Sequence, residues 1–226
     1  GRNSAVFPPV FALNMPPPGL QDPQGSCGSW AIAYAVRSYH LYKDECNAAY
    51  NNIDYPGSRL FSPAFLHNQL LAFLGGDCME DGITPQLGLS RMKYQGVSTW
   101  RKMPYNPFDC STQPNNFQKK NASFFKINSF SRISDVSEDM IKLAVSFECP
   151  VLISVLVDEG FSRDGGTVWS QHHGKIRGNH GIVICGWDDN RQAYKIMNSW
   201  GNGWGNQGFG WISYNYLKEV LLHQEA

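Results

Sequence analysis

The spacing of the apolar residues changes about half-way along the chain, and this change constrains the fold more than any other feature of the sequence. The first half has the spacing of amphipathic helices, which are expected over residues 30–42, 63–74 and 85–94. The second half starts with a short helix after Ser137 and continues with four apolar runs of strand length, at residues 151–157, 182–187, 194–198 and 209–213. A helical part followed by a β-rich part predicts an α+β fold of two lobes, with a cleft between them.

The ends of several elements carry start and stop signals. Ser62 followed by Pro63 is a typical helix start, and Gly75 marks the end of the same helix. Residues 188–190 indicate the turn of a β-hairpin, because the later ligands of a calcium loop are missing. The first 23 residues contain six prolines and are expected to be extended along the surface.

These patterns place residues 1–226 in one domain of two lobes. The helical lobe is expected over residues 12–112 and the β-rich lobe over residues 113–226, so that the boundary falls near residues 110–120. The second lobe is expected to be an antiparallel sheet or barrel.

Composition and charge exclude several classes of function. Nineteen Lys and Arg balance nineteen Asp and Glu, so no broad positive surface for nucleic acid or an anionic membrane is expected. No apolar run approaches the roughly 20 residues that span a bilayer. Six cysteines form no C-x-x-C pair, and the adjacent His172 and His173 cannot easily aim at one ion, so no metal and no cofactor are expected. Cys185 lies in an apolar run and is expected to be a buried thiol.

One cysteine lies where a thiol can become a nucleophile. Cys27 stands in a turn of Gly and Ser residues, directly before the first expected helix. The N-terminal end of a helix has unpaired N–H groups and positive potential, which favour the thiolate and can bind a developing oxyanion.

Two later residues can complete the chemistry of that cysteine. His180 lies among glycines at the start of an apolar strand, and Asn198 precedes a loop rich in Gly and Trp at residues 199–205. A cysteine nucleophile needs a base, and the base needs a third group that fixes its tautomer. Cys27, His180 and Asn198 supply these three groups.

Together these residues resemble the papain-like cysteine peptidases, and the resemblance covers nearly the whole chain. Cys27 and His180 are 153 positions apart (180 minus 27), close to the roughly 130–150 of that family. Further residues match landmarks of the family: Ser62–Leu66, Gly96–Val97, Pro104–Tyr105, Asn198–Gly201, Gly203–Gly205 and Gly208–Gly210.

The turn around Cys27 allows two alignments with the family, because one of its two usual cysteines is absent here. In the first alignment Cys27 is the nucleophile, and Gln21, six residues earlier, supplies an oxyanion-hole amide. This alignment resembles a shorter bacterial branch that has a Q-x5-C turn. In the second alignment Cys27 is a structural cysteine, paired with Cys78, and Gln24 is the family glutamine. Ser29 then fills the nucleophile position, which would make the protein a pseudoenzyme.

The first alignment implies peptide hydrolysis through a Cys–His–Asn acyl-enzyme mechanism, with Trp200 shielding the bond between His180 and Asn198. Two alternatives are a catalytically inactive peptide-binding relative and a thiol acyltransferase. The resemblance implies substrate contacts that are listed here: Asp81, Gly82, Asn179 and Trp204. It also implies a monomer that acts on peptides or proteins, meets a propeptide or protein inhibitor, and works in a secreted, periplasmic or lysosome-like compartment.

Overall fold

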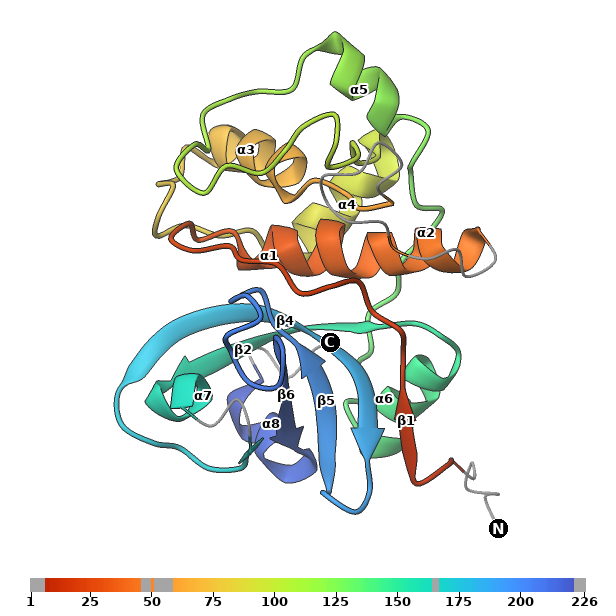
Figure 1. Cartoon of the computed structure of the whole chain (residues 1–226), viewed down its shortest axis with the longest axis vertical. Helices are drawn as coiled ribbons and strands as arrows, with labels where there is room; N and C mark the ends of the chain where they lie inside the picture. The colour runs from red at the N-terminus through yellow and green to blue at the C-terminus, as the bar shows by residue number, and fades with distance from the viewer. Residues whose placement is uncertain (1–6, 46–49, 51–58, 164–166, 222–226) are drawn as a thin grey trace. The chain divides into compact units, whose positions relative to one another are not determined.

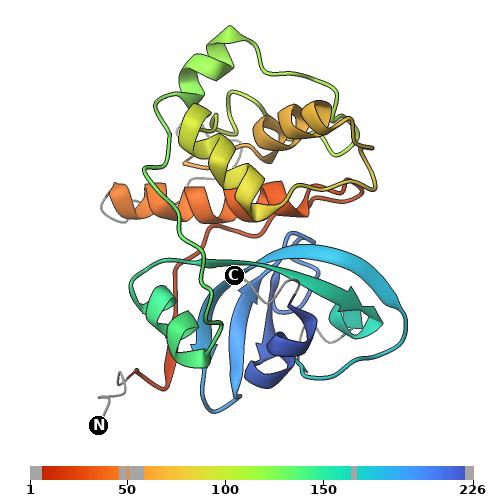
Figure 2. The ribbon, with the colours of Figure 1, turned by 180° about the vertical axis from the view of Figure 1, so that it is seen from behind.

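A computed structural model describes residues 7–45, 50, 59–163 and 167–221 of the chain. The chain forms two compact units, one of residues 20–131 and the other of residues 1–19 with 132–226. The helical unit thus ends at residue 131, later than the boundary near residues 110–120 that the sequence suggested, and the first 19 residues belong with the sheet. Figures 1 and 2 show the elements of each unit from two sides.

The helical unit begins with a helical segment that runs unbroken from Cys27 to Asp44. It consists of α1 (Cys27–Ser29), the π-helical η1 (Trp30–Arg37) and α2 (Ser38–Asp44). The expected helix over residues 30–42 is therefore confirmed, but it starts three residues earlier, at Cys27. π-helical turns are rare and are frequently found at functional sites.

Two further helices follow the predicted limits closely. They are α3 (Pro63–Leu74) and α4 (Pro85–Gln95). The Ser62 hydroxyl accepts a hydrogen bond from the backbone N–H of Phe65, and Gly75 ends α3 in the left-handed conformation with φ of 70°. These are the start and stop that the sequence predicted for α3.

The helix α5 (Asn116–Ala122) was not predicted from apolar spacing. Its signal is a capping box, in which Asn115 and Gln118 each accept a hydrogen bond from the other residue's backbone N–H. In Figure 1, α5 is the green helix of this unit and follows a long loop after α4.

The other unit is built on an open six-stranded sheet. Its strands are β1 (Val10–Ala12), β2 (Val151–Asp158), β3 (Val168–Trp169), β4 (Ile176–Asp188), β5 (Ala193–Met197) and β6 (Phe209–Ser213). The order is β1–β4–β5–β6–β3, and β2 also pairs with β4. β2 and β1 follow one another along β4, because β2 pairs with residues 176–184 and β1 with residues 186–188.

The sheet is open and not closed into a barrel, because β3 at one end pairs only with β6 among the described strands, and an open sheet is one of the two forms predicted. It departs from the prediction in two respects. It is mostly antiparallel, but β3 runs parallel to β6. β4 starts at Ile176 and not near residue 182, so His180 lies inside the strand, opposite Val155 of β2.

Within the proline-rich start of the chain, residues 10–12 are extended, as predicted, and form the strand β1, whereas residues 22–23 lie in a turn and residues 1–6 are outside the described part of the chain. β1 pairs with the end of β4, and the Trp187 indole donates a hydrogen bond to the carbonyl oxygen of Pro8 at 2.9 Å. The Phe11 ring stacks on Trp187 with ring centroids 4.9 Å apart. These contacts attach residues 8–12 to the sheet although no apolar alternation marks them.

The described residues of the sheet unit also form the helices α6 (Glu138–Ser146), α7 (Glu159–Arg163) and α8 (Tyr214–Val220). The sequence predicted α6 after Ser137 but neither α7 nor α8. α6 packs on β2 and β4, and α8 packs on β2 and β6. None of the helices described in either unit is long and apolar enough to cross a membrane.

The cysteines are used differently from one another. Cys78 and Cys110 form a disulfide, whereas Cys27 does not take part in one, so the alternative pairing of Cys27 with Cys78 is wrong. Cys185 is fully buried as predicted, and burial raises the pKa of its thiol to about 12. Cys46 lies outside the described residues.

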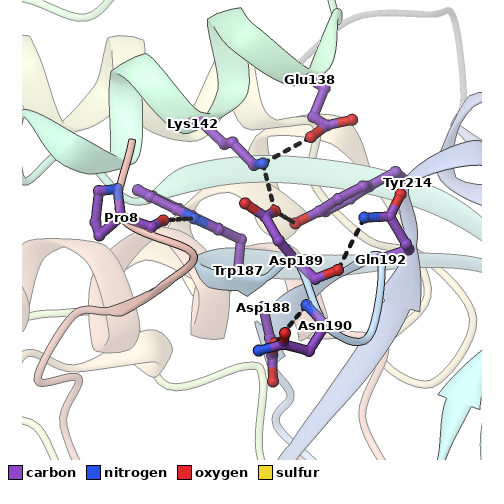
Figure 3. Close-up of polar contacts among 9 residues, drawn as sticks. All are labelled: Pro8, Glu138, Lys142, Trp187, Asp188, Asp189, Asn190, Gln192 and Tyr214. Atoms are coloured by element: carbon purple, nitrogen blue, oxygen red, sulfur yellow. Dashed lines mark hydrogen bonds and ion pairs between the residues drawn. The ribbon is translucent and has the colours of Figure 1, made fainter. Parts of the chain in front are cut away.

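A buried lysine links α6 to the turn between β4 and β5 (Figure 3). The Lys142 ammonium lies 2.6 Å from a carboxylate oxygen of Glu138 and 2.5 Å from one of Asp189. The Tyr214 hydroxyl donates to the same oxygen of Asp189 at 2.6 Å, and its ring lies 4.9 Å from the ammonium. Burial alone raises the pKa of Asp189, but the bonds from Lys142 and Tyr214 outweigh it and lower that pKa.

We expect Lys142→Met to destabilise the protein by about 2 kcal/mol, because Asp189 keeps its charge and loses its cation. The midpoint of urea unfolding measures the loss. The matched control is Lys93→Met on the exposed side of α4, which should change stability by less than about 0.5 kcal/mol. Equal stability of the two variants would contradict the role of Lys142.

A buried histidine makes the helical unit sensitive to acid. His67 in α3 is fully buried, and neither ring nitrogen has a hydrogen-bond partner among the described residues. Burial lowers its pKa from 6.5 to about 4. A pKa lowered by folding means that the folded state favours the neutral ring. The free energy of unfolding therefore has its full value above pH 6.5, and it falls as the pH drops from 6.5 towards 4.

We expect His67→Leu to remove most of this pH dependence. The difference between the two pKa values corresponds to about 3 kcal/mol of stability at low pH. Urea unfolding of both proteins at pH 7 and pH 4.5 measures it, and the variant should lose less stability than the wild type. An equal loss in both proteins would show that His67 is not the group that titrates.

Candidate active site

Cys27 is the first residue of α1 and is half-buried. Ser26 precedes it at the N-cap position, but the Ser26 side chain does not cap the helix. Its hydroxyl instead lies 2.7 Å from the Tyr105 hydroxyl. The helix start at Cys27 therefore keeps its positive potential without a capping oxygen from Ser26, and such potential stabilises a thiolate.

The turn around Cys27 packs closely against the segment 79–83. A Cβ atom on Gly25 would lie 2.8 Å from the carbonyl oxygen of Asp81, and one on Gly28 would lie 2.5 Å from that of Ile83. Only glycine fits at these two positions. The turn thus brings Asp81 and Gly82, both predicted to contact substrate, next to the predicted nucleophile.

Gln21 lies at the start of the same turn and is 8% exposed. Its side-chain amide nitrogen donates a hydrogen bond to the carbonyl oxygen of Gln24 at 3.0 Å. Gln24 is itself held, because its amide nitrogen donates to the carbonyl oxygen of Asn106 at 3.0 Å. The amide of Gln21 is therefore fixed within the turn that leads to Cys27.

The sheet unit holds His180 and Asn198 together. Nε2 of His180 lies 2.7 Å from Oδ1 of Asn198, and both residues are buried. The backbone N–H of Ser199 donates to the same Oδ1 at 2.8 Å, which identifies this atom as the amide oxygen. An amide oxygen only accepts, so Nε2 of His180 carries the hydrogen. In the neutral ring Nδ1 then holds the lone pair that can take up a proton.

Aromatic rings surround the bond between His180 and Asn198. The Trp200 ring lies 4.8 Å from the His180 ring, and the Phe161 ring approaches His180 edge-on at 5.7 Å. Phe161 also contacts the rings of Trp169 and Trp204, at 5.0 and 4.9 Å. These rings surround the buried bond, and the shielding role expected of Trp200 stays a prediction.

A buried carboxylate fixes the position of Phe161. Asp158 accepts hydrogen bonds from the backbone N–H of Phe161 at 3.1 Å and from the Trp169 indole at 3.2 Å. His173 donates its backbone N–H at 2.9 Å, and Nδ1 of His172 lies 2.8 Å away. Burial alone raises the pKa of Asp158, but these donors outweigh it and lower that pKa.

The remaining predicted residues lie in the sheet unit. Asn179 is exposed and precedes His180 on β4. Trp204 is buried, and its indole donates to the carbonyl oxygen of Phe161 at 3.2 Å. No group of three metal-ligating side chains occurs among the described residues. Asp158 and Phe161 were not predicted, because neither residue has a motif and their contacts arise only from the fold.

Comparisons with known proteins identify the family. The model of the papain family of cysteine proteases matches residues 21–226. The chain belongs to the papain family. The residues that the family model matches include Cys27, His180 and Asn198, and this match confirms the resemblance seen in the sequence.

Relatives of this papain-family chain are distant. An uncharacterized peptidase C1-like protein of Acanthamoeba polyphaga mimivirus is 24% identical over 212 residues, which are 88% of this chain and 64% of the viral protein. A cathepsin B-like cysteine proteinase of Haemonchus contortus is 34% identical over 62 residues, which are 26% of this chain and 18% of that protein. The chain thus spans less than two thirds of the curated relatives' length.

Solved structures confirm a papain-like α+β fold. Xylellain, a cysteine protease from Xylella fastidiosa, superposes with a TM-score of 0.79 at 21% identity, covering 96% of this chain and 84% of xylellain. Procathepsin L 3 of Tenebrio molitor gives a TM-score of 0.73 at 16% identity, covering 98% and 67% of the two chains. These identities support the likeness of fold alone.

We predict that neutral His180 is protonated on Nε2. Long-range ¹H–¹⁵N spectra, recorded at a pH where the ring is neutral, should show a protonated Nε2 and an unprotonated Nδ1. Asn198→Ala should give a mixture of the two tautomers, because the acceptor that selects Nε2–H is lost. A protonated Nδ1 in the wild type would contradict the assignment of the Asn198 oxygen.

Proposed function

We propose that this papain-family protein hydrolyses peptide bonds by a Cys–His–Asn acyl-enzyme mechanism. The observation that carries the proposal is the 2.7 Å bond between Nε2 of His180 and Oδ1 of Asn198. This bond leaves Nδ1 of His180 as the nitrogen that exchanges protons, as a general base requires.

Cys27 is the proposed nucleophile. It is outside any disulfide and stands at the start of the helical segment, where the positive potential favours a thiolate. Ser29, the nucleophile position in the other alignment, is fully buried within α1. These facts support the alignment in which Cys27 acts and Gln21 is the family glutamine.

The proposed reaction has two stages. The Cys27 thiol gives its proton to Nδ1 of His180, and the resulting thiolate attacks the peptide carbonyl carbon. The oxyanion accepts hydrogen bonds from the Gln21 amide and the Cys27 backbone N–H. The C–N bond breaks as His180 gives its proton to the leaving amine. A water molecule, losing a proton to His180, then attacks the thioester, and the C–S bond breaks to release the acid and the thiol.

Other residues are proposed to support this reaction. Trp200 shields the bond between His180 and Asn198. Asp81 and Gly82 bind extended substrate beside the Cys27 turn, and exposed Asn179 contacts substrate from the sheet unit. We assign Trp204 to packing, because its indole is already bonded to Phe161.

The setting of the reaction is also proposed. The substrate is a peptide or protein, and the enzyme acts as a monomer without cofactor. Two of the solved neighbours are procathepsins, which supports a propeptide for this protein. The disulfide between Cys78 and Cys110 supports an oxidising compartment such as the secretory route, the periplasm or a lysosome-like organelle.

We expect Cys27→Ala to abolish hydrolysis of an unstructured protein such as casein, with a loss of at least about 1000-fold. Alkylation of residue 27 by iodoacetamide, located by peptide mapping, should also disappear. The control is Cys149→Ala, which removes an exposed thiol and should keep full activity. Full activity of Cys27→Ala would contradict the proposal.

The same assay separates the two alternative functions. A peptide-binding pseudoenzyme would bind casein peptides without cleaving them, and its Cys27 would not react faster than Cys149. A thiol acyltransferase would form amide products when a primary amine is added, which mass spectrometry detects. We expect free carboxylic acids as the products under both conditions.

A further inference from the structure

The hydroxyl of Tyr105 lies between the two ends of the turn that leads to Cys27. It donates a hydrogen bond to the carbonyl oxygen of Gln21 at 2.6 Å and lies 2.7 Å from the Ser26 hydroxyl. A carbonyl oxygen only accepts, so the single phenolic hydrogen points to Gln21. The Ser26 hydroxyl must therefore donate to Tyr105, which gives a directed chain from Ser26 through Tyr105 to Gln21.

The ring of Tyr105 is held by aromatic neighbours. The Trp30 ring meets it edge-on at 5.0 Å, and the Trp100 ring lies at 6.3 Å. Burial raises the pKa of Tyr105 and outweighs the hydrogen bonds with Ser26 and Trp30, which lower it; the negative charges of Asp22 and Cys27 add to the increase. The phenol therefore stays protonated when Cys27 is a thiolate, and it remains a donor to Gln21.

The chain of hydrogen bonds acts on both ends of the turn. At one end it fixes the backbone of Gln21, whose side-chain amide is the proposed oxyanion donor. At the other end it directs the Ser26 hydroxyl away from the N–H groups of α1. A serine at the N-cap position usually accepts a hydrogen bond from one of these N–H groups, but Ser26 does not. The next residue, Asn106, holds Gln24 in the middle of the turn.

We infer that Tyr105 is a positioning residue for the Gln21 amide, one of the two proposed oxyanion-binding groups. The inference rests on the proposed function, in which Gln21 and the start of α1 stabilise the oxyanion. Tyr105 is assigned no contact with substrate, because its phenolic hydrogen is already bonded to the Gln21 carbonyl oxygen. It acts through Gln21, and its loss should weaken binding of the transition state more than binding of the substrate.

The test compares two reactions of Cys27 in the Tyr105→Phe variant. Peptide hydrolysis forms an oxyanion, whereas alkylation by iodoacetamide displaces iodide at a saturated carbon and forms none. We expect kcat for hydrolysis to fall by about tenfold, with KM and the rate of Cys27 alkylation unchanged. Tyr94→Phe, which removes an exposed hydroxyl on α4, is the matched control and should change neither reaction.

A second pair of variants tests whether Tyr105 acts through the Gln21 side chain. Gln21→Ala should lower kcat by itself, and adding Tyr105→Phe to it should lower kcat no further. A purely structural role would give additive losses. It would also slow the alkylation of Cys27, because a disturbed turn changes the thiol itself.

Each outcome bears on a separate claim. Unchanged kcat in Tyr105→Phe, equal losses in hydrolysis and alkylation, or additive losses in the Gln21→Ala background would overturn the role of Tyr105. A wild-type protein that neither hydrolyses peptides nor reacts at Cys27 would instead overturn the proposed function, and the role of Tyr105 with it.

Discussion

Strand β4 is the element on which the sheet unit depends. Its hydrogen bonds join β2 and β1 along one edge and β5 along the other. His180 lies within this strand, so its backbone is fixed by pairing on the side of Val155. Only the orientation of the ring then remains to be determined, and Asn198 and the surrounding aromatic rings determine it.

In the helical unit, the turn that leads to Cys27 is fixed in a different way. The turn of residues 21–26 has no regular pairing with a strand, and side chains supply the missing bonds. The amides of Gln21 and Gln24 and the hydroxyls of Ser26 and Tyr105 bond to backbone or to one another. Loops that carry chemistry need such bonds, because a buried polar group without a partner usually destabilises the folded state.

The sequence allowed much of this structure to be predicted. The helix α3 followed from Ser62, Pro63 and Gly75, since caps are local signals that one residue type satisfies. The start of β4 was missed, because Gly178 and Asn179 rarely form strands and only pairing with β2 makes them one. β3 is two residues long and parallel, so no local pattern could reveal it.

In the candidate site, too, some residues could be predicted from local sequence motifs, whereas others depend on contacts that form only on folding. Cys27, His180 and Asn198 lie in short glycine-rich motifs that are recognisable from the sequence alone. Asp158 and Phe161 have no motif, because their roles depend on neighbours that folding brings together, such as Trp169 and His173. Sequence motifs therefore indicate the proposed reacting groups better than the residues that hold them.

The disulfide between Cys78 and Cys110 has a consequence for handling the protein. The segment after Cys78 forms the wall against which the turn of Gly25 and Gly28 packs. A thiol nucleophile at Cys27 must stay reduced, while the crosslink behind it must stay oxidised. Reductant therefore has two opposite effects on this protein. A low concentration keeps the Cys27 thiol reduced, and an excess reduces the disulfide between Cys78 and Cys110, which supports the segment that packs against the Cys27 turn.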